Sequence, residues 1–367
     1  MSSFGGAYQG TDVLLTGHTG FKGSWLALWL EQLGARTIGL ALDPATDPAL
    51  CTLADACSGL TDHRGDIRDA KLLETLIGDA KPRIILHLAA QAIVRESYET
   101  PLDTLNTNVM GTANLLEAVR RAGHPCSVVV VTSDKCYENV NWDYGYRETD
   151  PMGGSDPYSM SKGATELVVS SWRRSFFDPN GPIRVASARA GNVIGGGDWA
   201  RDRIMTDCIS ALCAGTPIGV RNPVATRPWQ HVLEPLSGYL ELGARMLEPD
   251  GGRFATGWNF GPAVQSVCNV QRLVEGMIDA WGSGSWEDLS DPTAVHEAKL
   301  LSLTWEKAYH HLDWEPTWSL DQCLTATADW YRGWHEKPGS ARTNCLSQID
   351  AYESRARELR LPWAVGH

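Results

Sequence analysis

A short apolar stretch that runs directly into regularly spaced glycines places the strongest constraint on the fold of this chain. Asp12–Thr16 has the composition of a buried strand, and Ser24–Leu33 has that of an apolar helix. Glycines of the intervening turn lack a Cβ, so the backbone can turn sharply and approach a pyrophosphate, and the helix N-terminus offers N–H groups to the phosphates. This order predicts a dinucleotide-binding fold, and a glycine-rich turn without a ligand is the alternative. The residues of the turn that we expect at the cofactor are Gly17, His18, Gly20, Phe21, Lys22 and Gly23.

Strand-like and helical patterns alternate through the first half of the chain. This alternation predicts an α/β protein with a Rossmann-type, doubly wound, parallel sheet. After about residue 190 the pattern breaks into glycine- and proline-rich turns between short helices. We expect a dinucleotide-binding domain over residues 1–190 and a smaller mixed substrate lobe over residues 191–367, with crossings back to the first domain. The predicted strands are Asp12–Thr16, Thr37–Leu42, Arg83–Ala89, Val128–Val131 and Arg184–Ala188, and the later helices are Thr104–Arg121, Ser159–Phe176, Ser237–Leu247 and Val270–Ala280.

Charge and cysteine spacing exclude several classes of partner. Lys and Arg number 32 and Asp and Glu number 44, a net charge of −12, which argues against nucleic acid or an anionic membrane. No apolar run reaches the roughly 20 residues of a membrane span, and the N-terminus lacks the pattern of a signal peptide. The nine Cys show no CxxC spacing, which predicts reduced thiols in the cytoplasm and neither disulfides nor a metal site.

Polar residues directly follow the four consecutive valines of Val128–Val131. Such a run reads as a strand buried on both faces. Ser133, Asp134 and Lys135 come next, and ligands of open α/β sheets bind outside the carboxyl ends of the strands. We therefore expect chemistry here, with an ordinary polar turn as the alternative.

Tyr158 and Lys162 stand four residues apart in the segment PYSMSK, so they share one face of a helix. A phenol with a pKa of about 10 is a poor base at neutral pH. A cation about 4 Å away contributes on the order of 4 kcal/mol at an effective dielectric of about 20, enough to lower the phenol pKa by a few units. We therefore predict that Tyr158 is a base activated by Lys162.

Two acidic positions bear on the adenosine end of the cofactor. Asp43 ends the second strand about 20 residues past the glycine turn, where a carboxylate bonds the ribose hydroxyls and repels a 2′-phosphate. It favours NAD over NADP, and a simple turn at Asp43–Pro44 is the alternative. Asp66 and Ile67 are candidates to flank the adenine, with a solvated Asp as the alternative.

Together these features resemble the extended short-chain dehydrogenase/reductase family. The resemblance runs from about Thr11 to Trp330 and includes LAAQ after the third strand and Asn108 in NTNVMGT. It implies a Rossmann domain, bound NAD and a nucleotide-diphosphate sugar held by the C-terminal lobe. Further cofactor contacts implied by the resemblance are Leu88, Ala89, Ala90, Asn108, Tyr158 and Lys162.

Within the family, an acid at Asp134 resembles the sugar 4,6-dehydratases, because epimerases generally have none there. His18–Leu26, Ser133–Asn139 and Arg227–Val232 resemble the branch that acts on CDP-glucose. The resemblance implies a hydro-lyase that forms CDP-4-keto-6-deoxyglucose and water, with NAD regenerated in each turnover. A dehydratase of another nucleotide sugar, a 4-epimerase and a non-catalytic NAD-binding scaffold are the alternatives.

The implied mechanism gives each catalytic residue one task. Tyr158 removes the proton of the C4 hydroxyl while Ser133 holds that oxygen, and Asp134 in its protonated form assists the loss of the C6 hydroxyl as water. Lys135 is the proposed base for the C5 proton, which requires a depressed pKa. If Lys135 stays charged it orients the substrate, and Glu138 or water takes the proton instead.

The substrate lobe contributes residues suited to a diphosphate. Arg227 lies in RPWQHV and brings the planar fork that binds phosphate, with surface ion pairs as the alternative for each Arg. Deoxysugar biosynthesis, for lipopolysaccharide among others, is the implied role. A homodimer or dimer of dimers through helices Thr104–Arg121 and Ser159–Phe176 is implied as well. The residues expected at the substrate are Gln91, Ser133, Asn192, Arg203, Arg221 and Arg227.

Overall fold

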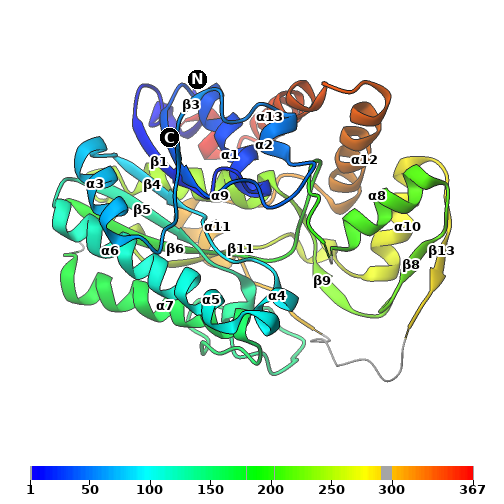
Figure 1. Cartoon of the computed structure of the whole chain (residues 1–367), viewed down its shortest axis with the longest axis horizontal. Coiled ribbons are helices and arrows are strands. Elements are labelled where there is room, and N and C mark those ends of the chain that lie inside the picture. The colour runs from blue at the N-terminus through cyan, green and yellow to red at the C-terminus, as the bar shows by residue number, and fades with distance from the viewer. Residues whose placement is uncertain (1, 179, 202, 291–299, 367) are drawn as a thin grey trace.

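The centre of the protein is a parallel sheet of seven strands. The structure, a computed structural model, describes residues 2–178, 180–201, 203–290 and 300–366. The strand order is β11-β6-β5-β4-β1-β2-β3 (Figure 1), and every neighbouring pair is parallel. The predicted Rossmann-type sheet is thereby confirmed. Its strands are β1 (Asp12–Thr16), β2 (Arg36–Ala41), β3 (Leu60–Arg64), β4 (Ile84–His87), β5 (Cys126–Val131), β6 (Ile183–Ala190) and β11 (Gly257–Phe260).

Helices cover both faces of this sheet, as β5 illustrates. Val129 packs into the core that includes α1 (Phe21–Gln32) and α9 (Leu233–Arg245). Val128 and Val130 point to the other face, where they join the core formed by three other helices. The predicted strand covered on both sides is therefore confirmed. The three helices are α3 (Ala70–Ala80), α6 (Gly111–Ala122) and α7 (Pro157–Phe176).

The predicted single helix Thr104–Arg121 is wrong, because the segment is interrupted. A short helix, α5 (Pro101–Leu105), leads into a π-helical segment at Asn106–Met110 before α6 begins. Asn108 lies in this π-helical segment. Its amide oxygen accepts a hydrogen bond from the Gln91 N–H, and its amide nitrogen donates one to the Gln91 carbonyl. The wider helical turn thus points Asn108 at the chain leaving β4, in keeping with the frequent use of π-turns at functional sites.

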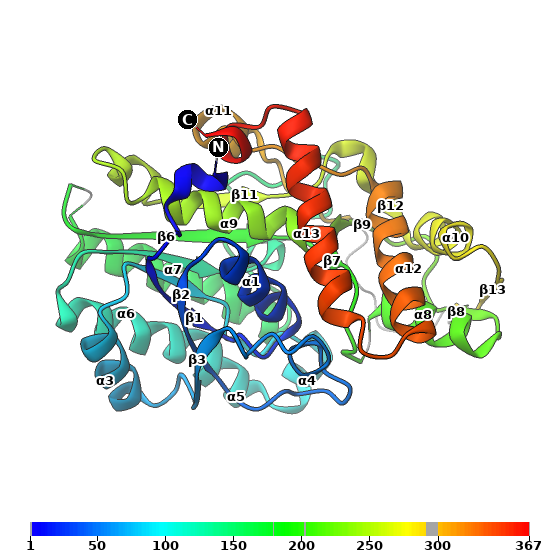
Figure 2. The ribbon, with the colours of Figure 1, turned by 90° about the horizontal axis from the view of Figure 1, so that it is seen from above.

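Smaller elements form a second lobe at the end of the molecule away from α3 and α6 (Figure 2). Its three two-stranded sheets are β7 (Val193–Ile194) with β10 (Gln230–His231), β8 (Ile218–Val220) with β13 (Trp286–Asp288), and β9 (Thr226–Pro228) with β12 (Val267–Asn269). The remaining helices, here and elsewhere, are α2 (Leu50–Leu53), α4 (Val94–Glu99), α8 (Ile204–Ala214), α10 (Val270–Trp281), α11 (Glu306–Leu312), α12 (Leu320–Glu336), α13 (Ala341–Glu358) and α14 (Pro362–Val365).

The chain crosses between the two parts more than once. After the first segments of the second lobe, α9 packs on the central sheet and β11 pairs with β6. Near its C-terminus the chain returns again: the indole of Trp29 on α1 bonds Glu353 of α13 at 2.8 Å. No helix of the described ranges combines the length and apolarity that crossing a membrane requires.

Candidate active site

Ser133 and Asp134 lie where β5 ends. Ser133 caps the short 3-10 turn Asp134–Cys136: its hydroxyl accepts from the Lys135 N–H at 3.2 Å and donates to Asp134 Oδ1 at 2.9 Å. The second carboxyl oxygen, Oδ2, is buried without a hydrogen-bond partner among the described residues. Burial raises the pKa of Asp134, although Lys135 and Arg227 oppose the rise. The carboxyl group is therefore biased toward the protonated form that a general acid needs.

Tyr158 lies in the first turn of α7, next to this acid. Asp156 caps the helix through the Ser159 N–H at 2.9 Å, and the Tyr158 N–H bonds Ser97 Oγ at 3.1 Å. The phenol is only 8% exposed. Burial raises its pKa to about 12, while a hydrogen bond with Ser133 works in the opposite direction. The structure therefore brings Ser133, Asp134 and Tyr158 together in one cluster, and their catalytic roles stay predictions.

Lys162 is the residue that the sequence predicts to activate Tyr158. Its Nζ lies 5.9 Å from the centroid of the Tyr158 ring, on the same helix face. Burial lowers the pKa of Lys162 to about 8, so most of the amine stays cationic at neutral pH. Burial of the phenol therefore dominates the pKa of Tyr158 in the protein by itself, and its activation by Lys162 stays a prediction.

A buried ionic network lies behind the cluster, and the sequence did not predict it. Glu166 of α7 accepts from Thr132 Oγ1 at 2.5 Å, from Ser187 Oγ at 2.7 Å and from Arg189 at 2.7 Å. Arg189 also donates to the Tyr137 hydroxyl at 2.6 Å. These bonds tie α7 to the ends of β5 and β6 and fix the helix that carries Tyr158. No local sequence signal marks them, because the partners come from separate elements.

Lys22 occupies an unexpected place among the residues of the glycine turn. Its Nζ lies 3.5 Å from the hydroxyl of Tyr239, a buried residue of α9, and 5.8 Å from the centroid of that ring. Burial lowers the pKa of Lys22 to about 7, with further lowering by Arg203 and Lys162. Electrostatic coupling to Asp134 places Lys22 beside the catalytic cluster. Tyr239 was not predicted, because an aromatic residue at helical spacing looks like ordinary core.

The glycine turn has the bare backbone that a dinucleotide needs. Gly17 has a φ of +77°, and a Cβ there would lie 2.7 Å from the Ala89 nitrogen. A Cβ on Gly23 would lie 2.1 Å from the Gly17 oxygen, so α1 packs against the turn only with glycine at this position. Leu88, Ala89 and the rest of the predicted LAAQ segment follow β4 beside this turn. The residues present therefore fit a dinucleotide whose pyrophosphate meets the N-terminus of α1.

Charged pairs surround the predicted adenosine end. Asp43 is 89% exposed, with Arg64 of β3 at 3.7 Å. Asp66 accepts from the backbone and the guanidinium of Arg68, so its carboxylate is already engaged. Ile67 is buried and fills the space opposite Gly111, where a Cβ would lie 2.6 Å from its side chain. The roles of these residues at the cofactor stay predictions.

The predicted substrate residues differ in how close they come to the cluster. Arg227 is buried, and its charge opposes the rise in the pKa of Asp134. The charge of Arg203 lowers the pKa of both Tyr158 and Lys22. Gly191, which precedes Asn192, approaches Asp134: a Cβ there would lie 3.2 Å from Oδ2. Arg221 lies 3.8 Å from Asp207 of α8 and is 55% exposed. Glu138, the alternative base, is exposed and lies against Gly153.

Two tryptophans and one cysteine pack in or against the hydrophobic core. Trp229 is 4% exposed, and Trp199 packs edge-on against Tyr331, so both are part of the hydrophobic core. Cys136 is fully buried, and burial raises its thiol pKa well above the usual range.

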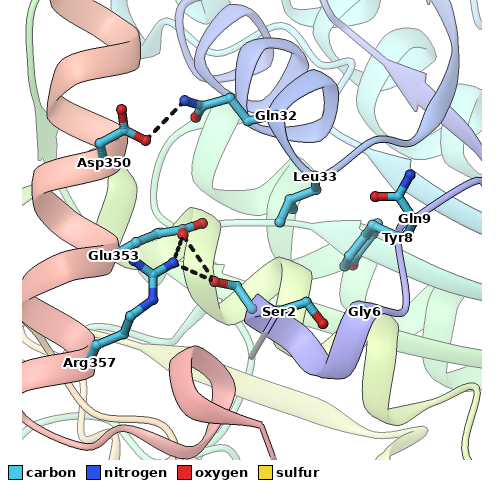
Figure 3. Close-up of a pocket in the computed structure, with 10 residues that line it drawn as sticks. Ser2, Gly6, Tyr8, Gln9, Gln32, Leu33, Asp350, Glu353 and Arg357 are labelled. Carbon is cyan, nitrogen blue, oxygen red and sulfur yellow. Dashed lines mark hydrogen bonds and ion pairs between the residues drawn. The ribbon is translucent and has the colours of Figure 1, made fainter.

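A hollow between the N-terminal segment and α13 is separate from this site (Figure 3). Gln32 donates to Asp350 at 3.1 Å across it, and Glu353 accepts from Ser3 at 3.0 Å and from Arg357. None of its lining residues is a predicted site residue. These bonds hold α13 against the start of the chain.

The comparisons with known proteins agree with this architecture. Residues 14–327 match the family described as GDP-mannose 4,6 dehydratase. The chain belongs to this family, which places it in the extended short-chain dehydrogenase/reductase class suggested by its motifs. It is 47% identical over 331 residues to the CDP-glucose 4,6-dehydratase of Salmonella typhimurium, covering 89% of this chain and 92% of that protein.

More distant relatives share the same fold. The dTDP-glucose 4,6-dehydratase of Xanthomonas campestris is 27% identical over 339 residues, 87% of this chain and 92% of that protein. The solved dTDP-glucose 4,6-dehydratase of Streptomyces venezuelae, with NAD and TYD bound, has a TM-score of 0.72 at 25% identity and covers 88% of this chain and 98% of its own. The UDP-glucose 4-epimerase of Thermotoga maritima has a TM-score of 0.74 at 20% identity, with 88% and 99% covered, which shows the fold alone.

Proposed function

We propose that this protein converts CDP-glucose to CDP-4-keto-6-deoxyglucose and water. The observation that carries the proposal is the buried carboxyl group of Asp134, with one unpartnered oxygen, beside the phenol of Tyr158. A 4-epimerase needs only the phenol, whereas elimination of the C6 hydroxyl also needs an acid. The 47% identity to a CDP-glucose 4,6-dehydratase supports the same reaction.

NAD is the cofactor that this site fits. The glycine turn, the LAAQ segment and Asn108 would hold it, and Asp43 suits unphosphorylated ribose hydroxyls. When bound, NAD would supply a hydride acceptor for oxidation at C4 of the sugar, a hydride donor for reduction at C6, and a positive charge. Because reduction follows oxidation within one turnover, no external reductant is consumed.

The protein's own groups move the protons. Tyr158 in its phenolate form accepts the proton of the C4 hydroxyl while Ser133 Oγ holds that oxygen, and the C4 ketone then acidifies the C5 proton. Asp134 donates its proton to the departing C6 hydroxyl. Arg227, which acts on this acid, and Arg203, which acts on Tyr158, would hold the diphosphate of the substrate.

An amine takes the C5 proton in this scheme and returns it to C5 when the hydride arrives at C6. Lys135 directly follows Asp134, so the acid for C6 and the base for C5 would come from one turn of the chain. Lys22 is a second candidate, favoured by its pKa of about 7, which leaves about half of the amine free at neutral pH. Asn108, Gln91 and Asn192 are proposed to position cofactor and substrate without exchanging protons.

A panel of nucleotide sugars tests the reaction. The protein is incubated with NAD and CDP-, dTDP-, GDP- or UDP-linked glucose, or with GDP-mannose, and the products are weighed by mass spectrometry. Loss of one water from CDP-glucose, with much slower loss from the others, is the expected result. Unchanged mass with altered C4 configuration would instead identify an epimerase. NAD binding without any reaction would identify a scaffold.

We further propose a cytoplasmic homodimer, or a dimer of dimers, that serves deoxysugar and lipopolysaccharide biosynthesis. Apolar side chains stand out on helices next to the site: Leu102 of α5 is 73% exposed, Met110 is 52% exposed and Leu167 of α7 is 62% exposed. Exposed apolar side chains on neighbouring helices favour a protein partner. Sedimentation of the wild type and of Leu167→Glu tests the proposal: the variant should be monomeric, and a monomeric wild type would refute it.

A further inference from the structure

Three side chains of different chemistry converge beside the glycine turn. His18, Cys57 and Asp62 each present one donor atom, and these atoms lie within 4.8 Å of one another. The closest pair is His18 Nε2 and Asp62 Oδ1, at 2.9 Å. Imidazole nitrogen, thiolate sulfur and carboxylate oxygen are the three ligand types that zinc takes in proteins.

The local structure holds these groups firmly. His18 follows β1 and is fully buried, and its ring occupies space that exists only because Gly39 lacks a Cβ, which would lie 2.7 Å from Nδ1. Arg64 bonds Asp62 Oδ2 at 2.7 Å, which leaves Oδ1 to face His18. A carboxylate oriented by a second residue is typical of the surroundings of metal ligands.

A second sulfur lies next to the cluster. Cys51 of α2 shares a side-chain hydrogen bond with Cys57, which lies in the turn after that helix. Both residues are free thiols. The side chain of Asp62 is 29% exposed, so the cluster opens to solvent on that side.

We propose that His18, Cys57 and Asp62 bind one zinc ion at the edge of the glycine turn. Tetrahedral bonds of about 2.0–2.3 Å separate donor atoms by about 3.3–3.7 Å, so the His18 and Asp62 atoms move slightly apart and the sulfur moves closer. The Cys57 thiol releases its proton to solvent on binding, and the zinc charge is then balanced by one thiolate and one carboxylate. Water or Cys51 completes the coordination.

This site differs from the zinc sites that cysteine spacing excluded. Its ligands are 39 and 44 residues from His18 and come from three elements that only the parallel sheet brings together. A search for CxxC pairs does not detect such a site. The inference does not depend on the proposed dehydratase reaction.

Cobalt is the probe, because a cobalt–thiolate bond has its own absorption band. The full-length protein is stripped with a chelator, kept under a phosphine reductant so that Cys51 and Cys57 stay reduced, and titrated with Co²⁺ in the absence of nucleotides. One equivalent should bind with a thiolate-to-cobalt charge-transfer band, and Zn²⁺ should displace it. Absence of stoichiometric binding by the wild type would refute the site.

Matched variants assign the ligands. Cys57→Ser should abolish the charge-transfer band, and His18→Gln should weaken cobalt binding at least about tenfold. Cys213→Ser on α8 and His63→Gln on β3 change the same residue types outside the cluster and should bind like the wild type. A band that survives in Cys57→Ser, or one that is lost only in Cys51→Ser, would contradict the assignment. Thermal unfolding of the metal-free variants checks that each is folded.

Discussion

The amine of Lys22 reaches from the glycine turn to the hydroxyl of Tyr239 on α9, 3.5 Å away. The contact joins the cofactor half of the site to a helix that belongs to the later part of the chain. Because burial lowers the pKa of Lys22 to about 7, this amine changes charge within the physiological range. A group with that property beside Asp134 affects both the protonation of the acid and the supply of a free base.

Lys22→Met should therefore lower the rate of dehydration and remove a pH dependence. The free amine accumulates as the pH rises through about 7, so a wild-type rate that depends on it rises over the same range and then levels. We expect kcat to fall by about 10²–10⁴-fold and the inflection near pH 7 to disappear. Lys22→Arg keeps a charge that does not titrate and should also lose the inflection, and Lys135→Met serves as the comparison. An unchanged inflection in Lys22→Met would contradict this role.

Tyr158→Phe and Asp134→Asn should stop the reaction at different points. Without the phenol, the C4 hydroxyl keeps its proton, so no NADH absorbance should appear and turnover should fall by about 10²–10⁴-fold. With Asp134→Asn, oxidation and exchange of the C5 proton with deuterated water should continue while loss of water stalls. Ser58→Ala, which changes an exposed turn hydroxyl, is a control expected to behave like the wild type. Normal water loss in Asp134→Asn would remove the acid role.

Gly23→Ala should disrupt the cofactor site through packing alone. The added methyl would lie 2.1 Å from the Gly17 oxygen, so α1 must move away from the turn. We expect NAD affinity measured by calorimetry to fall at least about tenfold and the free energy of unfolding to fall by about 1–3 kcal/mol. Gly78→Ala is the matched control, because nothing lies within 4 Å of a Cβ there. On α3 that change should stabilise the protein by about 0.5–1 kcal/mol and leave NAD binding unchanged. Equal NAD affinity in both variants would contradict the packing argument.

Glu234→Gln should weaken a buried acceptor site between α9 and the C-terminal part of the chain. The carboxyl group accepts from the N–H groups of Thr317 at 2.9 Å and Trp318 at 2.7 Å and from the Tyr352 hydroxyl at 2.8 Å. An amide turns one acceptor into a donor, so we expect a loss of about 1–3 kcal/mol in urea unfolding. Glu336→Gln on the surface of α12 should cost nearly nothing.

The same residue gives a pH dependence of defined sign. Burial raises the pKa of Glu234 to about 7 from its ordinary value of 4.5, so the native carboxyl group binds a proton in this window and the unfolded one does not. The contribution of the protonated Glu234 carboxyl group to the free energy of unfolding is complete below about pH 4.5. It is lost as the pH rises through about 7. The stability difference between the wild type and Glu234→Gln should therefore shrink from pH 5 to pH 8. A difference that grows with pH would contradict the raised pKa.

Much of the fold and the centre of the site could be predicted from local patterns. The glycine turn, the valine strand and the Tyr158/Lys162 pair each signal their structure within a few residues. The edge strand β3 was missed because its sequence, LTDHR, is mostly polar and its side chains are exposed. The π-helical segment at Asn108 was missed because its reason, a bond to the chain at Gln91, is tertiary.

The site residues that the sequence did not predict also depend on tertiary contacts. Tyr239 reaches Lys22 across 217 positions of sequence, and Cys57 and Asp62 meet His18 only because β1, β2 and β3 are neighbours. The part that burial plays in the pKa of Tyr158 likewise follows only from the fold, since the exclusion of water around a phenol cannot be read from residue spacing. Local chemistry is visible in the sequence, but the meeting of distant groups follows only from topology.

The position of β11 at the end of the sheet limits how this enzyme class can diversify. A fragment that stopped after β6 would leave the edge of that strand open and would lack Trp258 and Phe260, two fully buried core residues. Such a fragment should aggregate, so the cofactor half is not a detachable module. An exchange of the second lobe would therefore have to keep β11 in place, because β6 needs that strand as its neighbour in the sheet.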